Sequence, residues 1–546
     1  MAEMPPSEAE DTSAEDLYTS EYQVGQDNVR LLGLDFHNPV FLVSAVTVIA
    51  FVVFTLSLPS VAEANFGALR PWLTTRFDWF FMLTANLLVL FCIALVVLPV
   101  GRLRIGGRDA RPMYSYVSWV SMLFAAGIGI GIMFYAVLEP MNHVLTPPLN
   151  MAPATELATR KLAMAATIYH WAIHPWAIYA VVGLSLAFFS YNKGLPLVMR
   201  SAMYPLFGER IWGWPGHIVD ILAVFATLFG LATSLGYGAE QAAGGMHFLF
   251  GLPDNEWLRL TIIVVITLAA LTSVLRGLDG GIKLLSEANM AMAAFLGLFV
   301  LVVGPTFGAF EAIARNTLAY LEYIPALSTW TDRDDFYYMH DWTTFYWAWW
   351  IAFSPFVGMF IARISTGRTV REFVLVSVIA PSFIFIVWMS VFGNAAMEQY
   401  FREGYTGVVE TVQQFRPELS LFRFLAEYPL PLLTSAVGIA LVLIFFVTSM
   451  DSGALIVDTM TAGGKINTPV VQRIFWCCFI GLIGIALLFG GGLASTQALA
   501  LATGFPFAAV ILLMAISLYR GLSLEHKLIE SGVIDGSGVD LPEGGS

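Results

Sequence analysis

Long apolar stretches recur along the chain from residue 40 to residue 519, with short polar segments between them. Each stretch is close to the roughly 20 residues that a helix needs to cross the hydrocarbon of a bilayer. The pattern predicts an all-α polytopic membrane protein with twelve transmembrane helices. We place these spans at 40–59, 78–100, 114–138, 164–190, 217–242, 258–275, 287–305, 343–364, 373–396, 432–450, 474–491 and 496–519.

The segments outside these spans differ from them in polarity. Residues 1–36 are acidic and lack the apolar centre of a signal peptide, which predicts a disordered cytoplasmic tail. Spans 1 and 2 fall within 37–112. The segment 307–341 is too mixed in polarity to cross a bilayer and predicts an external amphipathic helix and loop. Residues 521–546 predict a short acidic cytoplasmic tail.

Composition supports a membrane protein and excludes other classes. Of 546 residues, 58% are hydrophobic and 12% are charged, whereas soluble domains carry about a quarter charged residues. Membrane lipid is therefore an expected partner, and a net charge of −13 argues against nucleic acid. The three cysteines lie in apolar spans without disulfide or metal-ligand spacing. No P-loop, HExxH or GxSxG motif is present, so we do not expect an enzyme.

The distribution of Lys and Arg predicts the orientation in the membrane. These residues gather in loops that follow even-numbered spans, such as 102–111 and 363–371, whereas odd-numbered loops are rich in acids, as in TDRDDFYYMHD at 331–341. Positive residues favour the cytoplasmic side. We therefore expect both termini to be cytoplasmic.

Two spans carry residues that weaken helices. Span 3 contains AAGIGIGIMF, with glycines at 127, 129 and 131, and span 8 contains WWIAFSPFVGMF, with Pro355 and Gly358. Either span alone also fits close packing by small residues or an ordinary proline kink. However, span 3 opens the segment 113–306 and span 8 opens the segment 342–520. Interrupted helices in matching places predict an inverted-repeat transporter with its site near the middle of the bilayer.

An aromatic cluster lies deep in span 4, in YHWAIHPWAIYA at 169–180. On a regular helix Trp171, Trp176 and Tyr179 fall within about 140° of arc. In span 8, Trp347, Trp350 and Phe353 share one face. Single rings often only fill a bundle core, but the cluster favours a cage for a quaternary ammonium or sulfonium group. Cation–π attraction contributes roughly 2 kcal/mol or more once such a group is desolvated.

The charges around this predicted cage favour a zwitterion. We place Glu139 at the outer end of span 3 and Asp451 at the inner end of span 10, so that no acid lies beside the cage. A cage without a counter-charge suits a solute that carries its own carboxylate. We expect His170 and His174 to be structural rather than ligands or proton carriers.

The end of span 10 offers neutral oxygens for an ion. In FFVTSMDSG, Thr448 and Ser449 supply hydroxyl groups, and the broken span 3 supplies backbone carbonyls. Together they predict a five-oxygen site for a small hard cation. A Thr-Ser pair alone also fits hydrogen bonding back to its own helix.

Three long strings closely resemble the betaine/choline/carnitine transporter family: HWAIHPWAIY, AAGIGIGIMFY and WAWWIAFSPFVGMFIARISTGRTVREF. The resemblance covers essentially the whole chain outside the tails. It implies a LeuT-type fold, with two peripheral helices followed by two inverted five-helix repeats, spans 3–7 and 8–12. It also implies a homotrimer, alternating access and a multi-pass location in the bacterial cytoplasmic membrane.

The resemblance assigns roles to particular residues. The family's aromatic box maps onto Trp171, Trp176, Tyr179 and Trp350, with Trp347, Phe353, Gly129 and Gly131 beside it. A sodium site maps onto Ala125, Ile128, Phe445, Thr448 and Ser449. A second ion site would use Thr227 and Phe356, although Leu231 stands where sodium-coupled relatives have another threonine. Sodium is the implied coupling ion, and no cofactor is implied.

Departures from the family pattern refine the expected function. Phe353 stands where betaine carriers often have Trp, and Gly131 stands where choline carriers tend to have Asp. Spans 5 and 10 lack the positive side chain that sodium-independent exchangers place near the ion site. We therefore expect sodium symport of glycine betaine, dimethylsulfoniopropionate or a similar zwitterion. Sodium-independent carnitine or butyrobetaine exchange and proton- or sodium-coupled choline uptake remain alternatives.

Overall fold

The computed structural model describes residues 18–127, 129–276, 283–534 and 536. Among these residues, eleven helices are long and apolar enough to cross a membrane. The remaining expected span is divided into α3 (Tyr116–Gly127) and α4 (Ile130–Leu145). The all-α polytopic fold predicted from the apolar pattern is therefore confirmed.

The other elements follow the predicted order along the chain. The spanning helices are α1 (Asn38–Ser57), α2 (Pro59–Val97), α5 (Glu156–Trp171) with α6 (Ile173–Tyr191), α8 (Trp214–Phe250), α9 (Glu256–Arg276), α10 (Lys283–Val303), α12 (Phe345–Ile364), α13 (Val370–Phe401), α16 (Pro431–Thr461), α17 (Val470–Phe489) and α18 (Gly492–Glu530). The other elements include β1 (Asn28–Leu31), β2 (Leu34–His37), α7 (Tyr204–Phe207), α11 (Thr306–Leu327), α14 (Gly407–Gln413) and α15 (Ser420–Ala426).

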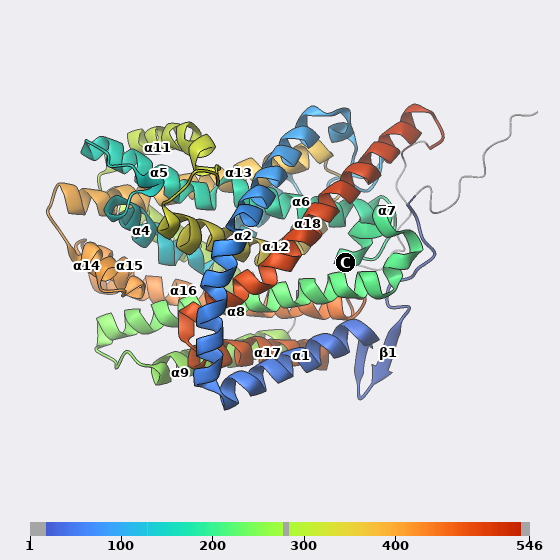
Figure 1. Ribbon diagram of the computed structural model, residues 1–546, viewed down its shortest axis with the longest axis horizontal. Coiled ribbons are helices and arrows are strands. Elements are labelled where there is room, and N and C mark those ends of the chain that lie inside the picture. Colours follow the sequence, from blue (N-terminus) through green and yellow to red (C-terminus); the bar gives the residue numbers. More distant parts are fainter. Residues whose placement is uncertain (1–17, 128, 277–282, 535, 537–546) are drawn as a thin grey trace, which may run out of the picture.

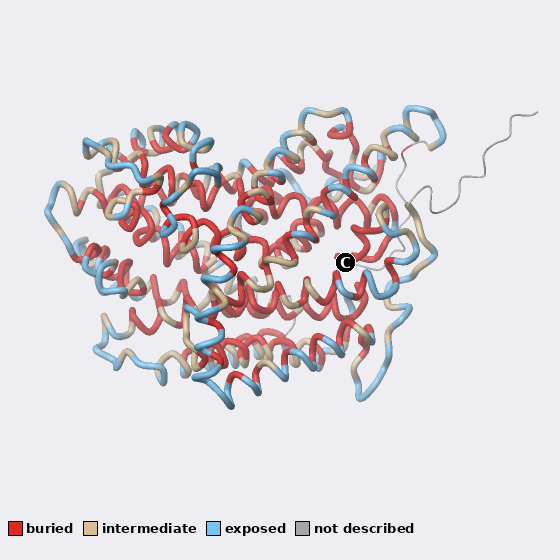
Figure 2. Tube along the Cα trace, in the orientation of Figure 1, coloured by how far each residue is buried: buried red, intermediate tan, exposed pale blue. Residues whose placement is uncertain are grey.

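The helices form an inner group and an outer group (Figures 1 and 2). In the most apolar window of α5 and α6, 94% of residues are buried, compared with 39% in α1 and 22% in α10. Inside, α6 packs against α12 and α8 against α16; outside, α2 lies along α18 and α1 lies along α17. Helices buried on all sides are where an internal binding site can form.

The predicted break in span 3 is confirmed. α3 ends at Gly127 and α4 begins at Ile130, with Gly129 in an extended conformation between them. The first amides of α4 and the last carbonyls of α3 have no partner within their own helices, as at any helix end. This break therefore exposes both donors and acceptors inside the bundle.

The predicted break in span 8 is wrong. α12 runs without interruption through Pro355, and it follows a segment of π-helix at Tyr337–Thr344. A proline cannot donate to the carbonyl four residues earlier, which here belongs to Ile351. The Ser354 hydroxyl donates to that carbonyl instead, at 2.7 Å. Gly358 serves close packing, because a Cβ there would lie 2.5 Å from the Val182 side chain.

An interruption that we did not predict lies in span 4, which we expected to be one helix. α5 ends at Trp171 and α6 begins at Ile173, with Ala172 at φ −97° and ψ −117°. Pro175 lacks the N–H that would bond to the Trp171 carbonyl, which favours a break here. The Tyr320 hydroxyl accepts a hydrogen bond from the Ile173 amide at 3.2 Å, so α11 satisfies part of the broken backbone.

The N-terminal tail is more ordered than we predicted, and the last helix extends into the predicted C-terminal tail. Residues 28–37, which include the last part of the expected disordered tail (1–36), form the β1–β2 hairpin, whose turn places Leu32 and Gly33 at positive φ. The Asn28 side-chain amide donates to the Ala462 carbonyl beyond α16, at 3.0 Å. α18 continues past residue 520 to Glu530, and Glu525 pairs with buried Lys193. Composition missed these segments because their order comes from tertiary contacts.

Ser354 offers a test of how α12 tolerates its proline. Leaving a buried carbonyl without a donor costs about 1–3 kcal/mol. We expect Ser354→Ala to lower the melting temperature of the purified protein in detergent. Adding Pro355→Ala should restore most of the loss, because the backbone N–H regained at position 355 can bond to the Ile351 carbonyl. Thermal unfolding of the single and double variants measures both effects.

The control is Ser377→Ala on α13, because Ser377 is fully buried and its hydroxyl has no partner among the described residues. It should change the melting temperature less than Ser354→Ala does. A double variant that is less stable than Ser354→Ala alone would contradict this account of α12.

Candidate binding site

A cavity of about 240 Å³ opens beside the break between α3 and α4. Its volume is below the range of about 300–1,000 Å³ typical of drug-sized ligands, so it suits a small solute. Aromatic side chains are the largest group in the wall, which combines residues of α4, α5, α6, α8, α10, α12 and α16. The lining residues are Gly129, Ile130, Gly131, Trp171, Tyr179, Ser234, Ser286, Asn289, Met290, Trp349, Trp350, Phe353, Phe356, Val357, Phe360, Phe445, Phe446, Thr448, Ser449 and Ser452.

Three rings of the predicted cage meet at near right angles in this wall. The centroids of Trp171 and Trp350 lie 5.2 Å apart with an interplanar angle of 84°. Tyr179 stands at 85° to Trp350, at 5.9 Å. The break at Ala172 places Trp171 and Tyr179 on separate helices, and the Trp350 indole N–H donates to the His170 carbonyl at 2.9 Å. The structure therefore brings Trp171, Tyr179 and Trp350 to one cavity.

Two predicted aromatic residues lie outside the cavity wall. Trp176 is buried behind it, at 5.5 Å and 84° from the Tyr179 ring. Trp347 is fully buried and directs its indole N–H toward the Met82 sulfur on α2, at 3.1 Å. Trp176 supports the wall from behind, whereas Trp347 joins α12 to the peripheral helix.

Both predicted glycines line the cavity, and Gly131 is required by the position of an indole. A Cβ at Gly131 would lie 2.4 Å from the six-membered ring of Trp171, which is closer than carbon atoms approach. Among the described residues, no atom lies within 4 Å of a Cβ built on Gly129. Gly131 therefore lets Trp171 lie directly against the start of α4.

The predicted sodium residues of α16 also reach the cavity. Phe445, Thr448 and Ser449 line its wall, and the Thr448 hydroxyl donates to the carbonyls of Ile444 and Phe445 at 3.0 and 3.1 Å. Because the proton of that hydroxyl is engaged by its own helix, the oxygen keeps lone pairs for a cation. Ala125 belongs to α3, in a stretch whose side chains are not described, and Ile128 lies outside the described residues.

Of the two residues of the second predicted ion site, one lines the cavity and the other does not. Phe356 lines the cavity, but the buried Thr227 hydroxyl donates to the Ala223 carbonyl at 2.8 Å and does not belong to the wall. Leu231 packs against Gly453, where a Cβ would lie 2.3 Å from its side chain. Close packing of α8 against α16 occupies this region.

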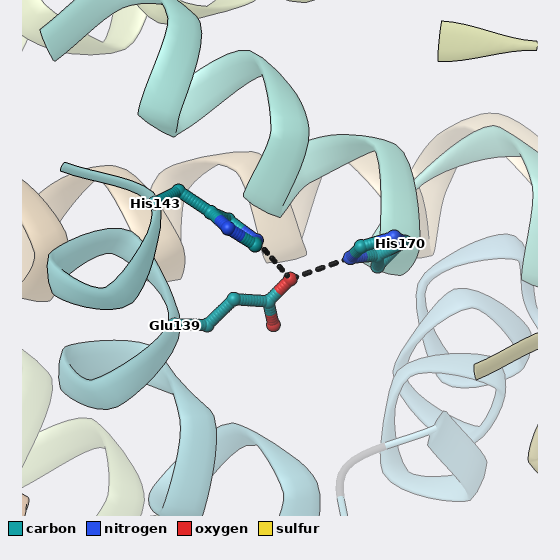
Figure 3. A group of neighbouring side chains, drawn as sticks. All are labelled: Glu139, His143 and His170. Atoms are coloured by element: carbon teal, nitrogen blue, oxygen red, sulfur yellow. Dashed lines mark hydrogen bonds and ion pairs between the residues drawn. The ribbon is translucent and has the colours of Figure 1, made fainter. Parts of the chain in front are cut away.

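An acid does lie beside the cage, which corrects our placement of Glu139. α4 continues to Leu145, so that Glu139 lies well inside the helix and is fully buried. Its Oε2 accepts hydrogen bonds from the Trp171 indole at 2.7 Å and from the Tyr346 hydroxyl at 2.6 Å. On Oε1, His170 Nδ1 lies at 2.6 Å and His143 Nε2 at 3.4 Å (Figure 3).

The histidines of this region are bonded to protein groups. His170 Nε2 lies 2.9 Å from the Thr343 hydroxyl, and His174 Nε2 lies 3.2 Å from the Asn86 side-chain oxygen. His143 was missed in the sequence because it stands alone near the end of a span. Its spacing of four residues from Glu139, one helical turn, was the available signal.

Comparison with known proteins agrees with this architecture. The family model described as betaine/carnitine/choline family transporter matches residues 39–527. A glycine betaine/proline/choline transporter of Vibrio parahaemolyticus is 51% identical over 533 residues, which cover 94% of this chain and 96% of the relative.

Two further relatives are also named as transporters. Glycine betaine transporter 1 of the same species is 47% identical, covering 93% of this chain and 98% of the relative. A glycine betaine transporter of Bacillus subtilis is 38% identical, covering 90% and 95%. The chain therefore belongs to the betaine/carnitine/choline family of transporters.

Proposed function

We propose that this protein imports a zwitterionic onium compound, such as glycine betaine or dimethylsulfoniopropionate, by sodium symport with alternating access. The observation that carries the proposal is the arrangement of Trp171, Tyr179 and Trp350 around one small cavity. A methylated onium group has no N–H to donate, so π faces attract it better than hydrogen-bond acceptors do. Rings at right angles present such faces from different sides.

The carboxylate of the solute has donors within the same wall. The N-terminus of α4 begins at Ile130, where unpaired amides and the helix dipole favour an anion. Trp349 also lines the cavity, and its buried indole nitrogen has no hydrogen-bond partner among the described residues. A solute that carries both charges can therefore bind with its cation at the rings and its anion at the start of α4.

Sodium coupling is supported by oxygen atoms at the C-terminal end of α3, on the opposite side of the break from α4, and on α16. α3 ends at Gly127, and the carbonyls at a helix C-terminus favour a cation. Thr448 and Ser449 add neutral hydroxyl oxygens from α16. A sodium ion shared by these groups would join α3 to α16 and hold one conformation of the bundle before the solute binds.

We still expect a zwitterion to be preferred, although Glu139 lies beside the cage. Both of its oxygens are already occupied by groups of the protein. It does not line the cavity and is not available to pair directly with a bound cation. The relative from Vibrio parahaemolyticus that is 51% identical is also named for choline, so choline belongs in any test panel.

The expected homotrimer, the cytoplasmic position of both termini and the bacterial cytoplasmic membrane remain part of this proposal. Both ends of the described chain lie with loops that follow even-numbered spans: the Gly536 carbonyl accepts from the Arg108 amide, and Asn28 bonds to the Ala462 carbonyl. Those loops carry most of the positive charge, which supports a shared cytoplasmic side.

The cage predicts a loss of affinity when one ring is replaced by a smaller, aliphatic side chain. We expect Trp350→Leu to weaken glycine betaine binding by about 30-fold or more, corresponding to roughly 2 kcal/mol of cation–π attraction. Binding is measured by competition against radiolabelled glycine betaine on purified protein, and folding is checked by size-exclusion chromatography.

Trp347→Leu is the matched control, because it makes the same change on the same helix outside the cavity wall. It should alter the affinity less than about threefold. Equal losses in the two variants would contradict a cage at Trp350, and normal affinity in Trp350→Leu would exclude it.

The ion site predicts a change in sodium dependence. We expect Thr448→Ala combined with Ser449→Ala to raise the sodium concentration for half-maximal uptake by about tenfold or more, since two ligand oxygens are lost. The measurement is initial uptake into proteoliposomes without internal solute, at increasing external sodium.

The control is Thr434→Ala combined with Ser435→Ala, an adjacent buried pair earlier on the same helix. Its sodium curve should match that of the unmodified protein. An unchanged curve in the Thr448 and Ser449 variant would remove this site, and uptake that needs internal solute but no sodium would favour exchange.

A further inference from the structure

Four groups surround the carboxylate of Glu139, two at each oxygen. They are His170, His143, the Trp171 indole and the Tyr346 hydroxyl. A carboxylate has about four acceptor positions, so four donors match its ionised form. In this arrangement His170 donates from Nδ1 and accepts from the Thr343 hydroxyl at Nε2, which is consistent with a neutral ring.

The same side chains do not have the geometry of a metal site. Glu139, His143 and His170 offer ligand atoms within 4.8 Å of one another. However, Glu139 Oε1 and His170 Nδ1 are only 2.6 Å apart. Two ligands of a tetrahedral zinc ion at about 2.1 Å lie roughly 3.4 Å apart. The contact between Glu139 and His170 is therefore a hydrogen bond. The role of Glu139 depends on the groups that are hydrogen-bonded to it.

One of those groups lines the substrate cavity. The Trp171 indole donates its N–H to Glu139, and its ring lies in the cavity wall at right angles to Trp350. A hydrogen bond to an ionised acceptor is stronger than one between neutral groups. It also polarises its donor, which places more electron density on the ring. That density determines how strongly a ring attracts a cation.

We propose that Glu139 is a positioning residue that acts through Trp171. Its charge fixes the indole by the N–H and strengthens the attraction of the ring for the onium group, without touching the solute. Because Tyr346 of the second repeat donates to the same oxygen, Glu139 also joins the two repeats behind the cage. This inference rests on the proposed function, since it concerns how the same cavity binds an onium group.

A double-mutant cycle tests whether Glu139 acts through the indole N–H. Trp171→Phe keeps an aromatic face but lacks that N–H. We expect Glu139→Gln to weaken glycine betaine binding by about tenfold in the unmodified background and by less than about twofold in the Trp171→Phe background. Trp171→Phe alone should weaken binding to a similar extent.

A parallel cycle with Trp350→Phe is the control. The Trp350 N–H donates to the His170 backbone carbonyl and not to Glu139. The tenfold effect of Glu139→Gln should therefore persist in the Trp350→Phe background. A purely structural role for Glu139 would give the same loss in both backgrounds and would overturn the inference.

The outcomes separate this inference from the proposed function. If the unmodified protein binds neither glycine betaine nor choline, the proposed function fails and the inference fails with it. If it binds glycine betaine and Glu139→Gln binds equally well, only the inference fails. If Glu139→Gln does not fold, Trp171→Phe decides alone, and unchanged affinity in that variant overturns the inference.

Discussion

Every backbone group that leaves a helix inside this bundle needs a new partner, because hydrocarbon offers none. Spans 3, 4 and 8 each contain a residue that disturbs regular helical hydrogen bonding, and the freed backbone groups find partners in a different way in each span. At Pro355 the Ser354 hydroxyl bonds to the freed carbonyl, and α12 stays continuous. At Ala172 the Tyr320 hydroxyl and the Trp350 indole bond to groups beside the break. At Gly129 the ends of α3 and α4 open onto a cavity, where a ligand is the natural partner.

The break in span 4 also arranges the aromatic residues. Because α5 ends at Trp171, this ring is freed from the helical register that holds Tyr179 on α6. Trp350 then meets both rings from α12, and its N–H bonds to the backbone just before the break. The same tryptophan thus stabilises an interrupted helix and forms one wall of the cavity. Gly131 permits the close approach of the Trp171 ring to the start of α4.

The buried carboxylate of Glu139 connects several helices behind the aromatic wall of the cavity. A lone carboxylate would be strongly unfavourable among apolar helices, and here the surrounding donors compensate for its burial. Those donors come from α4, α5 and α12, so the charge connects elements of both repeats. The cavity wall is therefore built of rings, while the charge lies one layer behind them.

The sequence by itself determined the class of protein, the number and order of the spans and the break at the alternating glycines. The length of an apolar stretch and the spacing of glycines are local properties, and both can be recognised in the sequence without knowledge of tertiary contacts. It also pointed to Trp171, Tyr179 and Trp350 through helical periodicity, and to Thr448 and Ser449 through their neutral hydroxyl oxygens opposite a broken helix.

Only the tertiary structure decided which interruptions are real and which residues share a wall. Whether Pro355 or Pro175 breaks its helix depends on the hydroxyl or ring that reaches the freed backbone, and those groups partly lie on other helices. Trp347 shares a face with Trp350 in sequence, yet it packs toward α2. Glu139 looked peripheral because its helix extends farther than the apolar pattern does, and all of its partners except His143 lie far along the chain. Such contacts are set by packing between distant segments, which local sequence does not encode.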